Sequence, residues 1–63
     1  MQINSFTDED DNKVVVGSKV TIVGYPEDWS ATVDHLDRRG SHITVHLNTG
    51  QSSAHHRIRL IKG

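Results

Sequence analysis

The stretch that decides the fold reads Trp29-Ser-Ala-Thr-Val-Asp-His-Leu36, then Asp37-Arg-Arg-Gly40, then Ser41-His-Ile-Thr-Val-His-Leu47, and ends with Asn48-Thr-Gly50. In both longer segments apolar residues alternate with polar ones, which is typical of a β-strand that buries one of its faces. The segment between them has Asp first and Gly last, as a type I turn prefers. The stretch therefore predicts a long β-hairpin at the centre of the chain.

The register of this hairpin is predicted from its apolar residues. A glycine at the end of such a turn commonly forms a bulge, which shifts the residues that face each other. Pairing Val33 with Ile43 and Ala31 with Val45 places the apolar side chains of both arms on one face. In this register His42 is expected opposite Asp34, and His46 opposite Ser30.

Short strands and turns are predicted on both sides of the hairpin. Lys19–Val23 alternates again, so Val20 and Ile22 are expected in the core, and Gly24–Asp28 is expected to be a loop. The remaining segments are a polar strand over Gln51–Ala54, a single 3₁₀ turn over His55–Arg57 and a last strand over Ile58–Ile61. Five short strands without an amphipathic helix predict a small closed all-β barrel, because closure removes exposed strand edges.

The first 13 residues differ in charge from the rest of the chain. They contain four acidic residues and one basic residue, a net charge of −3, whereas residues 14–63 contain six basic and four acidic residues, a net charge of +2. We therefore expect residues 1–13 to form a flexible, disordered acidic arm and residues 14–63 to form the barrel. Ile3 and Phe6 are apolar residues of this arm that could dock on the domain or on a partner.

Length and composition limit the remaining possibilities. Sixty-three residues, of which 33% are hydrophobic, correspond to one small domain, and the absence of cysteine excludes disulfides and thiolate metal sites. No apolar run approaches the roughly 18–20 residues of a membrane span, and the start of the chain does not resemble a signal peptide. A cytoplasmic protein without a membrane partner is expected.

The order of motifs resembles that of the Tudor branch of Src-homology-3-like small barrels. The resemblance covers residues 17–61 and implies a five-stranded Tudor-like barrel. Gly17-Ser-Lys-Val20 resembles the opening Gly-x-x-Val of that family, Trp29-Ser-Ala-Thr-Val33 its Trp-x-Ala-x-Val strand, Val45-His-Leu-Asn-Thr-Gly50 its Val-x-Phe-x-Asp-Tyr-Gly segment, and Ile58-Arg-Leu60 its closing Leu-Arg-Pro.

Tudor domains bind methylated lysine or arginine in an aromatic cage through cation–π attraction. The resemblance assigns Trp29 to this cage, with Tyr25 in the neighbouring loop. It departs from the family at Leu47, Asn48 and Thr49, which stand where an aromatic residue, Asp and Tyr are usual. The resemblance thus implies an incomplete aromatic cage on a conventional barrel.

Five histidines are a high number for 63 residues. His42 and His46 are on one face of a predicted strand, but four residues at about 3.3 Å each place them about 13 Å apart, too far to share a metal ion. We therefore expect outer-face histidines and no metal site. A pH-sensitive surface is the alternative, because protonation of all five would change the net charge from −1 to +4.

No set of residues with catalytic spacing is present. The chain has no thiolate nucleophile, and its serines and histidines are not accompanied by a strand-to-helix elbow or a glycine-rich oxyanion loop. We therefore expect a protein that is not an enzyme and that needs no cofactor and no small-molecule substrate.

Two hypotheses of function follow. The first is a protein-interaction module, accessory or regulatory in role, that contacts a protein partner or a second copy of itself through its loops and rim. The alternative is a nucleic-acid-binding barrel with a strip of basic residues and histidines for phosphates and aromatic residues for stacking, although a net charge of +2 is low for such a protein. The candidate binding residues are Tyr25, Trp29, Arg38, Arg39, His55, His56, Arg57 and Arg59, and for Tyr25 and Trp29 packing of the barrel rim is the other possible role.

Overall fold

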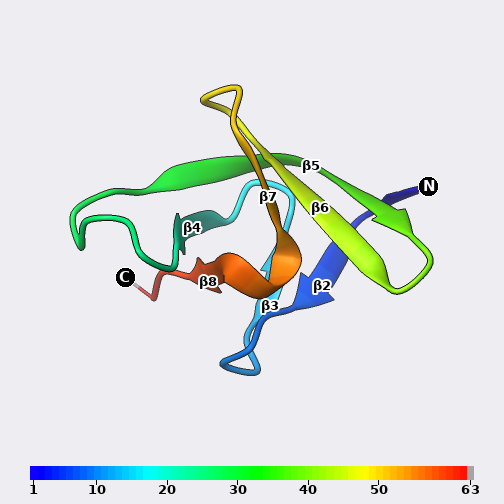
Figure 1. Ribbon diagram of the computed structural model, residues 1–63, viewed down its shortest axis with the longest axis horizontal. Helices are drawn as coiled ribbons and strands as arrows, with labels where there is room; N and C mark the ends of the chain where they lie inside the picture. The colour runs from blue at the N-terminus through cyan, green and yellow to red at the C-terminus, as the bar shows by residue number, and fades with distance from the viewer. Residues whose placement is uncertain (63) are drawn as a thin grey trace.

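The computed structural model describes residues 1–62, which form an all-β protein, as predicted (Figure 1). No helix in this part of the chain is long and apolar enough to cross a membrane. The elements in chain order are β1 (Gln2–Ile3), β2 (Ser5–Thr7), β3 (Lys13–Val15), β4 (Lys19–Ile22), β5 (Ala31–Arg39), β6 (His42–Leu47), β7 (Ser52–Ala54), the 3₁₀ turn η1 (His55–Arg57) and β8 (Ile58–Leu60).

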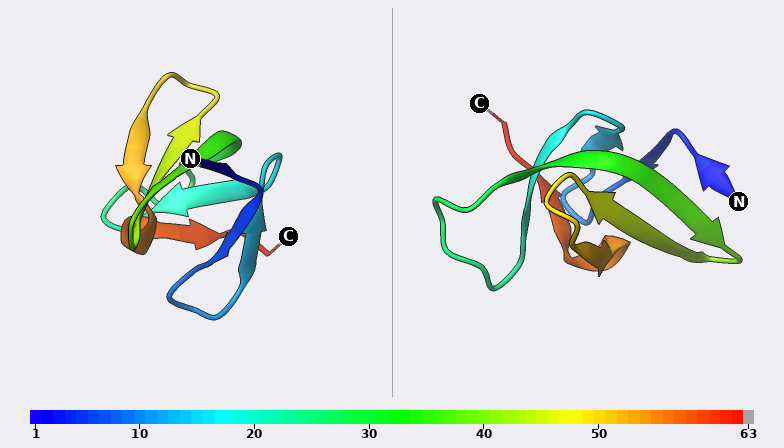
Figure 2. Two further views of the ribbon diagram at one scale, coloured as in Figure 1. Left: turned by 90° about the vertical axis from the view of Figure 1, so that its right-hand side faces the viewer. Right: turned by 90° about the horizontal axis from the view of Figure 1, so that it is seen from above.

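The main sheet has the order β7-β6-β5-β4-β8, and every neighbouring pair is antiparallel. β1 pairs with the C-terminal half of β5, at Leu36 and Asp37. The five predicted strands and the 3₁₀ turn are all present, but the predicted closed barrel is not. β7 and β8 are the two ends of the sheet and are linked by η1 without pairing to each other. The hairpin β2–β3 forms a second, two-stranded sheet (Figure 2).

The central hairpin is longer than predicted and has another register. β5 continues to Arg39, and the turn contains only Gly40 and Ser41. Gly40 has a φ of +61°, which suits the first turn position of a two-residue type II′ hairpin. The predicted pairings of Val33 with Ile43 and of Ala31 with Val45 were therefore wrong. Val33 pairs with Leu47, and Val45 pairs with Leu36.

A β-bulge in β5 changes which side chains face the core. The register shifts between Val33 and His35, so that Asp34 is an extra residue without a partner on β6. The bulge allows both Val33 and Leu36 to be buried, although simple alternation would place them on opposite faces. The turn at Gly40 and Ser41 places His35 opposite His46 on the outer face, so the predicted pairs His42–Asp34 and His46–Ser30 do not form.

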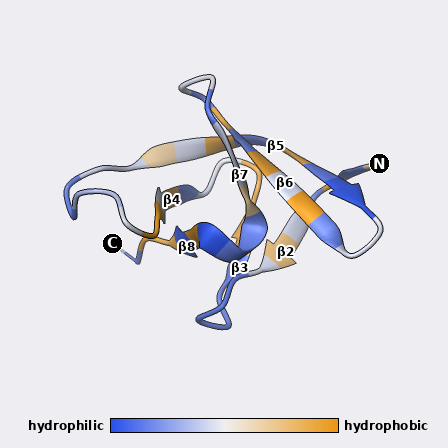
Figure 3. Ribbon diagram, in the orientation of Figure 1, coloured by the Kyte–Doolittle hydropathy of each residue, from blue (hydrophilic) through white to orange (hydrophobic). Residues whose placement is uncertain are grey.

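The core contains residues from both ends of the chain (Figure 3). Phe6 and Val14 from the β2–β3 hairpin are buried in one cluster with residues of the main sheet. The structure differs here from the flexible arm expected over residues 1–13. Removing the apolar ring of Phe6 from water stabilises the folded position of this segment. The buried hydrophobic residues are Phe6, Val14, Val20, Ile22, Ala31, Val33, Leu36, Val45, Leu47 and Ile58.

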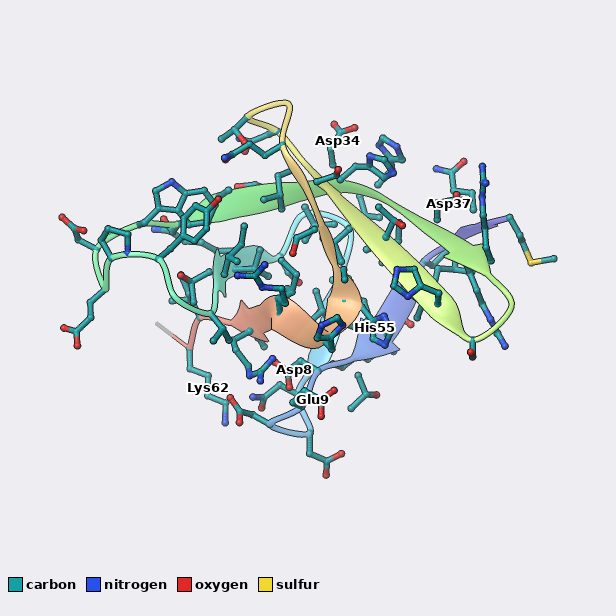
Figure 4. The ribbon with its side chains drawn as sticks, in the orientation of Figure 1. Asp8, Glu9, Asp34, Asp37, His55 and Lys62 are labelled. Atoms are coloured by element: carbon teal, nitrogen blue, oxygen red, sulfur yellow. The ribbon has the colours of Figure 1, made fainter. Side chains whose placement is uncertain are left out.

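Asp8 fastens this N-terminal hairpin to the last strand (Figure 4). Its side chain is 6% exposed, and its carboxylate accepts hydrogen bonds from the backbone N–H groups of Asp10 at 2.9 Å, Asn12 at 2.8 Å and Leu60 at 2.9 Å. Burial alone would raise the pKa of Asp8, but these three N–H groups and the nearby charge of Arg59 outweigh it and lower the pKa.

Candidate functional site

An exposed aromatic pair lies in the loop between β4 and β5. The ring centroids of Tyr25 and Trp29 are 4.7 Å apart at an interplanar angle of 57°. Tyr25 is 40% exposed, whereas Trp29 is half-buried and packs against the core. Trp29 therefore packs against the core and also contacts the ring of Tyr25 at the rim.

Two turns hold the aromatic pair in place. The backbone N–H of Tyr25 donates to the carbonyl of Ile22 at 3.1 Å, and that of Trp29 donates to the carbonyl of Pro26 at 3.0 Å. Because Pro26 restricts its own φ, the loop loses little further freedom when a partner binds. Both aromatic rings are thus presented by a short segment with defined hydrogen bonds.

Arg57 lies next to this loop. The N–H of Val23 donates to the carbonyl of Arg57 at 2.8 Å, and the Nη2 atom of Arg57 donates to the carbonyl of Val23 at 3.5 Å. Val23 is itself exposed, as is Arg57. We refer to Val23, Tyr25, Trp29 and Arg57 as the aromatic end of the molecule.

Arg59 does not extend a basic strip from Arg57. Its Nη1 atom donates to the carbonyls of His56 at 2.7 Å and Ile58 at 3.1 Å, and its Nε atom lies 3.6 Å from a carboxylate oxygen of Asp10. The guanidinium is thereby used to connect β8 with the β2–β3 loop. The sequence placed Arg57 and Arg59 in one surface, but the structure gives them separate surroundings.

Arg38 and Arg39 are at the opposite end of β5 from the aromatic pair, as the right view of Figure 2 shows. A nine-residue strand spans about 26 Å between its end residues at about 3.3 Å per residue. The Nε atom of Arg38 donates to the carbonyl of Gly40 at 2.8 Å, and Arg39 lies 3.6 Å from Asp37. The candidate residues therefore form two distant groups rather than one site.

The N-terminal amine joins this second group. It lies 3.0 Å from the Oδ1 atom of Asp37 and donates to it, which lowers the pKa of that carboxyl against a smaller opposing effect of burial. Arg39 and His46 lower this pKa further. We refer to the amine of Met1 with Arg38 and Arg39 as the basic tip.

His55 and His56 lie in η1 and have different surroundings. The Nδ1 atom of His55 is 3.2 Å from both the backbone nitrogen and the carbonyl oxygen of Ile43, and its ring meets Phe6 edge-on at 6.0 Å. His55 is thus half-buried and supports the fold, whereas His56 is exposed. His42 approaches His55 edge-on, with ring centroids 5.7 Å apart.

A stacked pair of histidine rings was missed by the sequence analysis. The rings of His35 and His46 are stacked in parallel, with centroids 4.1 Å apart and an interplanar angle of 8°. Their pairing follows from the two-residue turn at Gly40 and Ser41, because the register continues without a shift from Arg39 opposite His42 to His35 opposite His46. The sequence signal for the bulge was the presence of two polar residues, Asp34 and His35, between the core residues Val33 and Leu36, where strict alternation would have one.

No pocket is present in the part of the chain that the structure describes, and no three His, Cys, Asp or Glu side chains converge there on a possible metal position. Comparison of the chain with protein-family models, with curated proteins and with solved structures gave no match. Surfaces rather than cavities are therefore the features from which function must be argued.

Proposed function

We propose that this chain is a non-enzymatic protein-interaction module that contacts its partner through the aromatic end. The observation that carries the proposal is the contact of the exposed Tyr25 ring with the half-buried Trp29, in the same loop as the exposed Val23 that contacts Arg57. Tyr, Trp and Arg are the residue types most enriched among those that dominate binding energy at protein interfaces. The partner is a protein segment with apolar side chains, from another protein or from a second copy of the chain.

The architecture that we propose for this module is a small barrel of the Src-homology-3-like type. Its support is the five-stranded antiparallel meander β4–β8, in which η1 precedes the last strand and β8 returns to pair with β4. In such an arrangement the β4–β5 loop and η1 come together at one rim, which is where Val23 and Arg57 meet. A rim of this kind offers a contact surface without a deep pocket.

The experiment that tests this function is affinity capture with three immobilised forms of the protein. They are the wild type, Tyr25→Ser, and the double variant Arg38→Ser with Arg39→Ser, which changes only the basic tip. A partner protein that is retained by the wild type and the double variant, but lost by Tyr25→Ser, supports the proposal. A partner set that is identical for all three forms contradicts it.

Nucleic-acid binding is the second candidate, and one observation favours it. Arg38 and Arg39 are exposed at the basic tip beside the N-terminal amine, so three positive groups lie close together. Fluorescence anisotropy with labelled DNA and RNA distinguishes the two candidates. Affinity that falls steeply with salt and is lost in the Arg38/Arg39 double variant would favour nucleic acid over a protein partner.

A further inference from the structure

His35 and His46 are brought face to face on the outer side of the β5–β6 hairpin. They are directly opposite each other in the register that follows the bulge, and their rings are parallel with centroids 4.1 Å apart. The side chain of His35 is 44% exposed, so solvent has access to the pair. Two imidazoles on adjacent, hydrogen-bonded strands form a preorganised pair of nitrogen donors, since the sheet fixes their backbone positions.

Asp34 determines which nitrogen of His35 is free. The Oδ2 atom of Asp34 lies 2.7 Å from Nδ1 of His35. An ionised carboxylate can only accept a hydrogen bond, so Nδ1 carries the proton and donates it, which leaves the lone pair of a neutral His35 on Nε2. A carboxylate bound to the second nitrogen of an imidazole is the arrangement that orients histidine ligands in metal sites and raises their basicity.

The charge around the pair favours a cation. Asp34 is the extra residue of the bulge and precedes His35. Asp37 is on the same outer side of β5 as His35 (Figure 4). Asp34 is the carboxylate in contact with the pair, because Asp37 is already paired with the N-terminal amine at 3.0 Å and with Arg39 at 3.6 Å.

We propose that His35 and His46 together bind one transition-metal ion of the class that prefers imidazole, such as Zn²⁺, Ni²⁺ or Cu²⁺, through one nitrogen of each ring. Two nitrogens that share a tetrahedral zinc ion at about 2.0–2.1 Å are about 3.3 Å apart, and their lone pairs must converge on the ion. The lone pairs of the stacked rings lie in nearly parallel planes, so the two side chains must tilt out of the stack to bind it, which their positions on the outer face of the hairpin allow. Water completes the coordination, because no third ligand converges on the pair among residues 1–62. The site is on the outer face of the hairpin and stands independently of the aromatic end.

The test is a titration of the intact protein with Zn²⁺ at neutral pH, followed by calorimetry and by the ring-proton NMR signals of all five histidines. We expect one ion per chain, with the signals of His35 and His46 shifting together before those of the other three. His35→Ala and His46→Ala should each weaken binding at least tenfold. Asp34→Asn should weaken it about tenfold because the ring of His35 is no longer oriented, while its amide spectrum stays that of the folded protein.

His42→Ala is the matched control. His42 is on the same face of β6 as His46 but four residues away, about 13 Å along the strand. Its removal should leave zinc affinity within twofold of the wild type. The proposal is overturned if zinc does not bind, if all five histidines shift in parallel, or if His42→Ala weakens binding as much as His46→Ala.

Discussion

The carboxylate of Asp8 and the backbone N–H of Leu60 are joined by a hydrogen bond of 2.9 Å that connects the beginning of the chain to its end. The same carboxylate closes the β2–β3 loop by accepting the N–H groups of Asp10 and Asn12. Leu60 belongs to β8, the outer strand of the main sheet, whose N–H would otherwise face solvent at an unpaired edge. The Asp8 side chain thus accepts hydrogen bonds from a backbone N–H at the edge of the main sheet and from two backbone N–H groups in the loop of the β2–β3 sheet.

The first prediction concerns this connection. Asp8→Asn keeps the size of the side chain but replaces a charged acceptor of three N–H groups with a neutral amide. We expect the free energy of unfolding to fall by about 1–3 kcal/mol, because hydrogen bonds to charged groups are stronger and buried groups are left unsatisfied. Urea denaturation followed by circular dichroism measures this change.

Asp10→Asn is the control for that measurement. The side chain of Asp10 is exposed and makes only a loose ion pair with Arg59 at 3.6 Å. Exposed pairs of this kind contribute about 0–1 kcal/mol, so the control should differ little from the wild type. Equal losses in the two variants would show that Asp8 has no special role in joining the hairpin to β8.

The second prediction is a loss of stability in acid. The pKa values of Asp8 and Asp37 are lowered in the folded protein, so their carboxylates bind protons more weakly there than in the unfolded chain. Their stabilisation is complete above the ordinary value of 3.8 and is lost as the pH falls through the lowered folded values. Urea midpoints between pH 7 and pH 2 should decrease mainly below about pH 4.

Asp8→Asn should make this acid transition shallower, since one of the two groups no longer titrates. A wild-type midpoint that stays constant down to pH 2, or an equally steep transition in the variant, would be inconsistent with the lowered pKa of Asp8.

The third prediction tests the bulge in β5. Leu36 is fully buried, whereas the neighbouring His35 faces outward. Leu36→Ala should cost about 2–5 kcal/mol, while His35→Ala should cost about 0.5 kcal/mol or less. Chemical denaturation of both variants measures the difference, and a larger loss for His35→Ala would mean that the strand has no bulge at Asp34.

The fourth prediction separates folding from binding at the aromatic end. Trp29→Ala should lower the free energy of unfolding by about 2 kcal/mol or more, because the indole packs against the core. Tyr25→Ala should cost less than about 1 kcal/mol, since the ring is largely outside the core. Thermal unfolding of the two variants gives the comparison, and equal losses would mean that Tyr25 is as much a part of the core as Trp29.

Local sequence patterns predicted much of the main sheet. The alternation in Lys19–Val23 and Ser41–Leu47 gave β4 and β6, and the 3₁₀ turn over His55–Arg57 is where it was expected. These elements depend on neighbouring residues, and each keeps one apolar face. The core residues Val20 and Ile22 were accordingly identified, as were Ala31, Val33 and Val45 on the buried face of the hairpin.

Features that depend on distant contacts were not predicted. The charge of Asp8 and its neighbours indicated a flexible segment. The backbone N–H of Leu60, which donates a hydrogen bond to the Asp8 carboxylate, is 52 residues away in sequence. The predicted register of the central hairpin was wrong because the turn lies at Gly40 and Ser41 rather than at Asp37–Gly40, and the extra residue Asp34 changes the faces within β5. The stacking of His35 on His46, and with it the proposed metal site, follows from the position of that turn.

The central claim is that the aromatic end binds a protein, and the most direct measurement is the dissociation constant of the captured partner for the wild type and for Tyr25→Ala at two salt concentrations. We expect Tyr25→Ala to weaken binding at least tenfold, as removal of a central aromatic contact commonly does, with little dependence on salt. The opposite result is an affinity that Tyr25→Ala leaves unchanged, but that salt and the Arg38/Arg39 double variant reduce strongly. That outcome would contradict the account and move the contact surface to the basic tip.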